Sequence, residues 1–164
     1  MESIESEVLL STGLSADTRA HHPQQIHVVA AVICREGNYL IAQRAAEKRH
    51  GNMWEFPVGK IDPGESSERA IQRELREELG TEVISTSEPL FTIADLGSHF
   101  VIAFHLTVIE GEPRAIEHEA LAWVSRDELV NYHLAPCDKA FATFLNQTPD
   151  VDGAFLTERS DDQT

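Results

Sequence analysis

The sequence has 164 residues, of which 41% are hydrophobic, and this suits one globular domain with tails, without room for a second catalytic domain. It carries 13 Lys and Arg against 28 Asp and Glu, a formal net charge of −15 at pH 7. Polymeric nucleic acid is therefore not an expected partner, because its binding relies on a basic surface.

The sequence contains no pattern typical of a targeting segment, a membrane span or a set of paired cysteines. No basic start followed by an apolar run resembles a signal peptide, and no run of about 18 apolar residues predicts a membrane span, so we expect no membrane partner and a cytoplasmic location. Cys34 and Cys137 do not form a CxxC pair. We expect two reduced thiols rather than a disulfide framework or a zinc site.

The two ends of the chain differ from its middle. Residues 1–24 and 148–164 are polar and acidic, and they predict flexible tails on either side of a domain at residues 25–147. Within that domain IHVVAAVIC at 26–34 is rich in β-branched residues, and turn residues separate it from YLIAQR at 39–44. This pattern predicts a β-hairpin.

A polar loop at 45–53 leads to WEFPV at 54–58, a short extended segment that Pro57 restricts to an edge or an end of a sheet. After a glycine- and proline-containing loop, apolar residues recur every four positions at Ile71, Leu75 and Leu79. They predict a helix over 67–79, with Ser66 or Ser67 as its N-cap and Gly80 as its stop.

The second half of the chain predicts more strands, near residues 82–86, 89–96, 99–110 and 120–124. A short helix over 125–130 and a terminal helix over 138–146 follow. Strands on both sides of a central helix, with another helix at the end, indicate an α/β sandwich with a mixed sheet.

Three carboxylates crowd the end of the central helix. Glu74, Glu77 and Glu78 stand at positions i, i+3 and i+4 in the last turn, where like charges repel and the helix dipole disfavours negative charge. One interpretation is a solvated helix face with the ion pairs Arg73–Glu77 and Arg69–Glu65. The other is a site for Mg2+ or Mn2+, which prefers hard oxygen ligands and substrate phosphate.

The residues around these carboxylates follow a fixed spacing: Gly59, five residues, Glu65, seven residues, Arg73-Glu74-Leu75, one residue, Glu77-Glu78, one residue, Gly80. This segment resembles the signature of the Nudix hydrolases, and the similarity to MutT-type and CTP pyrophosphohydrolase-like members extends over residues 26–146. Thr81 stands where an aliphatic residue is usual, and Val58 in WEFPVGK stands where glycine is common.

The resemblance implies an α/β/α sandwich with a central mixed β-sheet and metal-dependent hydrolysis of a nucleoside diphosphate linked to another group. MutT-type members convert nucleoside triphosphates to the monophosphate and pyrophosphate, and usually remove damaged nucleotides from the precursor pool. By this resemblance Mg2+ or Mn2+ is held by Glu77, Glu78 and the carbonyl of Gly59, with Glu117, six residues before Trp123, as a further ligand. Glu74 is either another ligand or the base that deprotonates water.

Other residues are candidates for positioning and substrate binding. Arg73 is expected to orient the carboxylates through charge-assisted hydrogen bonds. Arg44 and Lys60 are the candidate phosphate contacts, because so acidic a site needs cations to hold a triphosphate. Phe56 is a candidate to flank the base. Asp138, similar to the aspartate of the cytidine branch, accepts from an amine when ionised and donates to an oxo group when protonated.

These residues predict a Nudix pyrophosphohydrolase that acts on oxidised or modified nucleoside triphosphates, of the 8-oxo-dGTP or the CTP and modified dCTP type, as a monomer or homodimer. Two alternatives remain: a Nudix-fold sensor that binds a nucleotide without cleaving it, and a hydrolase of another nucleoside diphosphate derivative.

Overall fold

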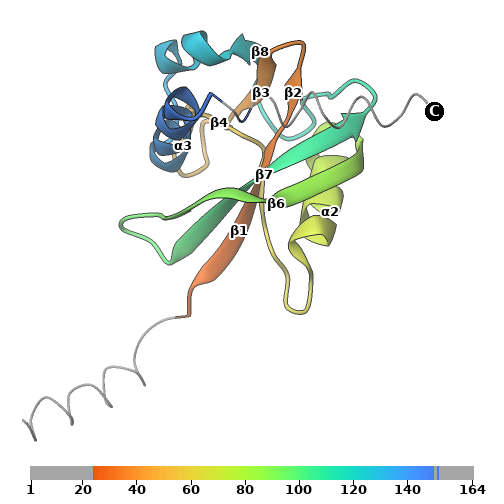
Figure 1. Ribbon diagram of the computed structural model, residues 1–164. Helices are drawn as coiled ribbons and strands as arrows, with labels where there is room; N and C mark the ends of the chain where they lie inside the picture. Colours follow the sequence, from red (N-terminus) through yellow and green to blue (C-terminus); the bar gives the residue numbers. More distant parts are fainter. Residues whose placement is uncertain (1–23, 150, 152–164) are drawn as a thin grey trace, which may run out of the picture.

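The computed structural model describes residues 24–149 and 151, and Figure 1 shows how their elements are arranged. The tails expected at 1–24 and 148–164 lie, apart from residues 24, 148, 149 and 151, outside the described residues. The chain forms two sheets, two α-helices and one short 3-10 helix within the described part.

The first sheet is mixed and has the strand order β5-β1-β7-β6. Its strands are β1 (Ile26–Val32), β5 (Val58–Lys60), β6 (Glu82–Ala94) and β7 (Phe100–Glu110). β1 runs parallel to β7, while β5 pairs with β1 and β6 pairs with β7 in antiparallel fashion. The mixed sheet expected from the sequence is therefore confirmed.

The second sheet lies beside the first and is built around β3. Its strands are β2 (Cys34–Arg35), β3 (Asn38–Gln43), β4 (Trp54–Glu55) and β8 (Ala120–Ser125). β3 pairs antiparallel with all three others.

Two strand predictions need correction. The expected hairpin is restricted to β2 and β3, because the chain leaves the first sheet at Ile33 and β1 pairs with β5 and β7 instead. The two strands expected at 82–86 and 89–96 are one long strand, β6, with irregular pairing to β7 around Pro89. Proline has no N–H to donate, which explains a local irregularity rather than a break.

The helices cover opposite faces of the first sheet. Alternate residues of β1 point to opposite sides: Val29 and Ala31 pack beneath α2 (Ser67–Leu79), whereas Ala30 and Val32 join the cluster beneath α3 (Pro136–Gln147). This is the α/β/α arrangement expected for the fold. The short helix expected at 125–130 is the 3-10 helix η1 (Arg126–Asn131).

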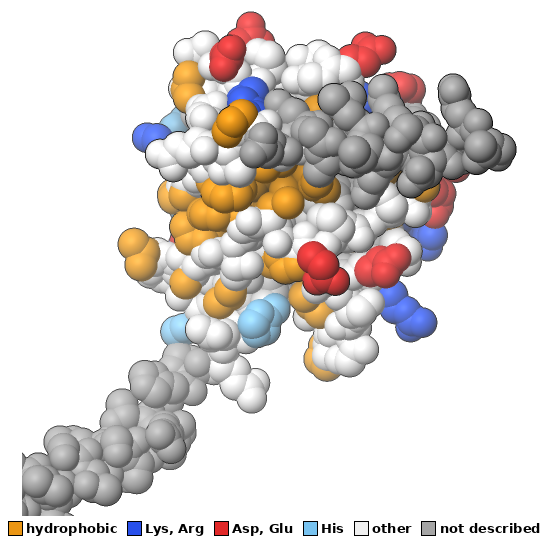
Figure 2. Space-filling model, in the orientation of Figure 1, with side chains coloured by type: hydrophobic (Ala, Val, Ile, Leu, Met, Phe, Trp, Pro, Cys, Tyr) orange, Lys and Arg blue, Asp and Glu red, His pale blue; other side chains and the backbone are white. Residues whose placement is uncertain are grey.

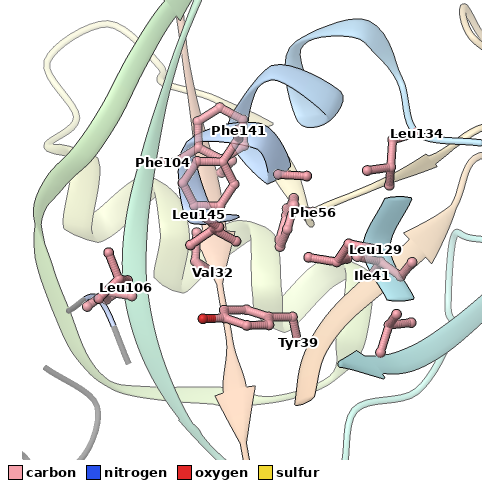
Figure 3. Close-up of a cluster of buried hydrophobic side chains, with 14 residues drawn as sticks. Val32, Tyr39, Ile41, Phe56, Phe104, Leu106, Leu129, Leu134, Phe141 and Leu145 are labelled. Carbon is pink, nitrogen blue, oxygen red and sulfur yellow. The ribbon is translucent and has the colours of Figure 1, made fainter. Parts of the chain in front are cut away.

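Aromatic rings fill the core beneath α3, as Figure 3 shows. Phe141 stacks on Phe104 of β7 with ring centroids 4.3 Å apart, and Phe56 meets both rings edge to face. Phe56 is fully buried. Its position between β4 and β5 links this core to the strands that border the functional site.

Local signals position α2. Ser66 is its N-cap and accepts a hydrogen bond from the backbone N–H of Arg69 at 3.2 Å, and Gly80 ends the helix in the left-handed conformation at φ 67°. Ile71, Leu75 and Leu79 are buried against the sheet. This orientation leaves the carboxylates of the last turns at the edge of the buried face.

The molecular surface reflects the acidic composition. Figure 2 shows hydrophobic side chains gathered across the middle of one face, with acidic side chains at the top, along the right side and directly below them. No helix within the described residues combines the length and the hydropathy that crossing a bilayer requires.

Candidate active site

A cavity of about 470 Å³ lies between the two sheets and the helices. Its walls come from β1, β5 and α2, from the loop at 45–53, from the loop before β8 and from the start of α3. A nucleotide-sized ligand suits a cavity of this volume. The segments that the sequence singled out therefore border one space.

Two carboxylates of α2 face this cavity. Glu74 and Glu78 line it, whereas the side chain of Glu77 is 55% exposed and lies outside the lining. Gly59 of β5 lies directly against Glu74, and a Cβ at Gly59 would overlap the Cγ of Glu74. The glycine therefore permits the close approach between β5 and α2.

Glu78 is the most strongly perturbed of these groups. It is only 8% exposed, and its Oε2 atom has no hydrogen-bond partner. Burial, together with the neighbouring charges of Glu74, Glu55 and Glu117, raises its pKa to about 9. A buried carboxyl with an unpartnered oxygen and acidic neighbours is unfavourable unless a proton or a cation neutralises it.

Arg73 organises the residues around Glu74. Its guanidinium donates to Glu65 Oε1 at 2.7 Å and Oε2 at 2.9 Å, to Glu74 Oε1 at 2.7 Å and to the carbonyl of Lys60 at 2.9 Å. This hydrogen bonding lowers the pKa of Glu65 to about 2. Burial raises the pKa of Glu74, while Arg73 opposes that rise.

The ion pairs proposed for a solvated helix face are only partly present. Glu65 pairs with Arg73 rather than with Arg69, because Glu65 lies in the loop before the helix and Arg73 reaches it from eight residues away. The Arg73–Glu77 pair is long, at 3.9 Å. Arg73 thus lies between the loop at Glu65 and the carboxylate of Glu74 and donates hydrogen bonds to both.

The loop that carries Glu117 is fixed to the end of α2. The N–H of Ile116 donates to the carbonyl of Glu78 at 3.1 Å, and the N–H of Glu119 donates to the carbonyl of Gln43 at 2.9 Å. Glu117 lines the cavity and lies near enough to Glu74 and Glu78 to raise the pKa of both. The structure thus brings Glu117 beside two of the three helix carboxylates.

Glu55 and His118 are site residues that the sequence reasoning missed. Glu55 is 4% exposed and accepts two hydrogen bonds from Arg44 Nη1, at 2.8 and 3.0 Å, while its Oε1 lies 3.1 Å from His118 Nε2. Both residues line the cavity. The available signal was the acidic residue between Trp54 and Phe56, since a buried strand rarely carries an unpaired carboxylate.

The candidate substrate contacts are not all brought together. Arg44 and Lys60 line the cavity, and the Lys60 ammonium lies 5.4 Å from the centre of the Phe100 ring. The ring of Phe56 lies in the core and does not line the cavity. Its backbone N–H contributes instead, because it donates to Asp138 Oδ1 at 2.9 Å.

Asp138 lies in the first turn of α3, at the cavity wall, and is 4% exposed. Burial raises its pKa well above the ordinary value, and the charge of Glu55 adds to this, although the hydrogen bond from Phe56 opposes it. A protonated Asp138 both donates and accepts hydrogen bonds.

The two departures from the Nudix signature have different surroundings. Val58 pairs with Ala30 in the first sheet and lines the cavity, so the backbone there is an ordinary strand. Thr81 is 2% exposed, and its hydroxyl has no hydrogen-bond partner. It occupies a packing position and does not line the cavity.

The donor set suits a hard divalent cation. Glu74, Glu78 and Glu117 supply carboxylate oxygens. A cation bound to the unpartnered Oε2 of Glu78 would neutralise this buried carboxylate in place of a proton. Within residues 24–149 and 151, no three acidic, histidine or cysteine side chains already gather as a metal-binding group. Glu74 is instead held by Arg73, so loading a cation requires some carboxylates to reorient.

Comparison with known proteins decides the family. The model of the NUDIX domain matches residues 24–145, which is most of the chain. The chain belongs to the Nudix family. It is 40% identical over 117 residues to the CTP pyrophosphohydrolase of Escherichia coli, an alignment that covers 70% of this chain and 87% of that protein. It is 36% identical over 107 residues to the 8-oxo-dGTP diphosphatase of E. coli, covering 62% and 81%.

Solved structures give the same fold. The solution structure of the E. coli ORF135 protein superimposes with a TM-score of 0.67 at 37% identity, covering 78% of this chain and 93% of that one. The MutT Nudix hydrolase from Burkholderia pseudomallei gives a TM-score of 0.66 at 31% identity, covering 74% and 98%. This Nudix hydrolase therefore shares its fold and most of its domain length with MutT-type enzymes.

Proposed function

We propose that this Nudix hydrolase is a pyrophosphohydrolase of nucleoside triphosphates and releases the nucleoside monophosphate and pyrophosphate. The observation that supports this most is Glu78, a buried carboxyl with an unpartnered oxygen beside Glu74 and Glu117 in a nucleotide-sized cavity. Neither a solvated helix face nor a purely structural role explains so costly an arrangement.

Glu74, Glu78 and Glu117, with the carbonyl of Gly59, would hold Mg2+, and Mn2+ has the same preference for oxygen ligands. When bound, the cation supplies a water of lowered pKa and offsets negative charge on the phosphate oxygens. Glu77 lies outside the cavity lining, so it is a ligand only if its exposed side chain turns inward.

The protein's own residues bind and orient the rest. Arg73 orients Glu74 and ties the loop at Glu65 to the helix, which fixes one wall of the site. Arg44 and Lys60 present cations to the phosphate chain in a cavity that the carboxylates of Glu74, Glu78 and Glu117 also line. If Glu74 is not a ligand, it is the candidate general base, because burial raises its pKa towards the pH at which the enzyme works.

The proposed substrates are oxidised or modified nucleotides of the CTP and modified dCTP type or of the 8-oxo-dGTP type. The names of the relatives support both types. Asp138 supports recognition of the base, because burial raises the pKa of its carboxyl at the cavity wall and so favours the protonated form, which has both a donor and an acceptor. Such a role is the removal of damaged nucleotides from the precursor pool.

We place this activity in the cytoplasm, as a monomer or homodimer. Cys34 and Cys137 form no disulfide, as is usual in a reducing compartment. The net charge of −15 supports a free nucleotide rather than a nucleic acid polymer as substrate.

The test is turnover of a panel that contains CTP, 5-substituted dCTP, 8-oxo-dGTP, dGTP and ADP-ribose in Mg2+, with pyrophosphate and phosphate measured separately. We expect the highest kcat/KM for one of the modified or cytidine triphosphates, with pyrophosphate as product. Binding of a triphosphate without turnover would favour a sensor, and turnover of ADP-ribose alone would favour the hydrolase of another nucleoside diphosphate derivative.

A further inference from the structure

Asp95, at the turn between β6 and β7, connects three segments around the cavity. Its Oδ2 lies 3.0 Å from Arg49 Nη2 in the loop at 45–53, and its Oδ1 lies 3.8 Å from the thiol of Cys137 at the start of α3. Asp95, Arg49 and Cys137 all line the cavity. The sequence pattern gave no reason to single out Asp95.

The carboxylate of Asp95 is held in place by its own turn. The N–H of Asp95 donates to the carbonyl of Phe100 at 2.9 Å, and Ser98 Oγ donates to Asp95 Oδ2 at 2.8 Å. The side chain is 11% exposed. Asp95 is therefore the fixed member of its ion pair, while the Arg49 side chain, 46% exposed, is the member with freedom to move.

Arg49 is placed beside another cation of the site. Arg44 Nε donates to the backbone carbonyl of Arg49 at 2.6 Å, so the two arginines border the same wall. Each has an acidic partner, Glu55 for Arg44 and Asp95 for Arg49. A guanidinium has five N–H donors, so an arginine held on one side by a carboxylate retains donors for a phosphate.

We propose that Asp95 is a positioning residue that holds the guanidinium of Arg49 against the cavity, where Arg49 contacts the phosphate chain of the substrate. This rests on the proposed function for the nature of the substrate. Without Asp95, the Arg49 side chain would adopt many conformations in solvent. Phosphate binding would then have to immobilise this side chain, and the entropy lost would weaken the binding of the phosphate chain.

The kinetic test compares Asp95→Asn, Arg49→Ala and the double variant with the unaltered enzyme, on its best triphosphate substrate. Asp95→Asn keeps the shape of the side chain and removes its charge. We expect KM to rise about tenfold or more in each single variant, with kcat within about twofold, because a contact made equally in the ground and transition states affects KM.

The double variant shows whether Asp95 acts through Arg49 or affects substrate binding independently of it. If Asp95 acts through Arg49, adding Asp95→Asn to Arg49→Ala raises KM no further. A further rise of the same factor in the double variant, or an unchanged KM in Asp95→Asn, overturns the proposal. Arg49→Lys should recover part of the lost affinity, because an ammonium still attracts phosphate but lacks the planar fork.

The matched control is Glu82→Gln, which removes the charge from the exposed ion pair between Arg76 and Glu82, outside the cavity lining. Its KM should equal that of the unaltered enzyme. Inorganic tripolyphosphate provides a probe independent of turnover: its Kd, measured by calorimetry in Mg2+, should rise in Asp95→Asn by the same factor as KM. If no nucleotide is hydrolysed, the proposed function fails, but an unchanged Kd for tripolyphosphate is what overturns the role of Asp95.

Discussion

Replacing Glu78 by glutamine should change how the stability of the metal-free protein depends on pH. Burial and acidic neighbours raise the pKa of Glu78 from 4.5 to about 9, so between these values the group is protonated in the folded chain and ionised in the unfolded chain. Folding then takes up a proton, and stability falls as pH rises. The fall is about 1.4 kcal/mol per pH unit, or about 3 kcal/mol by pH 7.

Glutamine matches the protonated carboxyl in shape and has no charge to lose. Glu78→Gln should therefore match the unaltered protein near pH 4.5 and become more stable relative to it as pH rises, with the difference levelling off near pH 9. The assay is urea unfolding in EDTA at several pH values, in which other titrating groups cancel from the difference. Added Mg2+ should stabilise the unaltered protein and not the variant, because the cation binds the ionised carboxylate.

Parallel stability curves of the two proteins in EDTA would contradict the raised pKa of Glu78. Such a result would mean that Glu78 reaches solvent or a partner and does not carry the penalty that makes it a candidate metal ligand. The same variant should lose several orders of magnitude in turnover with its fold intact, as monitored by circular dichroism.

Four further predictions concern neighbouring residues. Gly59→Ala should reduce both turnover and melting temperature, because its Cβ would overlap Glu74; full activity would contradict the close approach. Phe56→Ala should cost about 3–5 kcal/mol in urea unfolding, as for other buried rings, whereas Phe56→Leu should leave the ratio of substrates unchanged if the ring does not touch the base. Arg73→Lys should lower kcat by at least about tenfold, because lysine cannot reproduce the forked contacts to Glu65 and Glu74; unchanged kcat would remove the orienting role. Asp138→Asn should change the ratio of pyrimidine to purine turnover, and a constant ratio would remove Asp138 from base recognition.

Features set by neighbouring residues were predictable from the sequence. The helix over 67–79 occurs with the expected bounds, because its cap at Ser66, its apolar spacing and its stop at Gly80 all act within a few residues. The mixed sheet and the covering helices followed from the order of strands and helices.

Features set by distant residues were not predictable. The sequence predicted that residues 39–44 would pair with β1 in a hairpin. In the structure β7, about seventy residues later in the chain, pairs with β1, and the chain leaves the first sheet at Ile33. Phe56 was interpreted as a base contact, but the rings of Phe104 and Phe141 surround it.

The network around Glu55 was missed for the same reason. Its partners Arg44 and His118 are separated from it by 11 and 63 residues, so no local pattern relates them. The sequence did identify Arg44, since an acidic site needs cations. It could not show that a buried carboxylate orients that arginine.

We propose that the cavity beside α2 directs metal-dependent cleavage of a nucleoside triphosphate to monophosphate and pyrophosphate. The most direct measurement follows the products of CTP and 8-oxo-dGTP by 31P NMR, with Mg2+ and with EDTA. We expect monophosphate and pyrophosphate from at least one of them in Mg2+, and no products in EDTA or from Glu78→Gln. Release of diphosphate and inorganic phosphate, or equal turnover in EDTA, would contradict it.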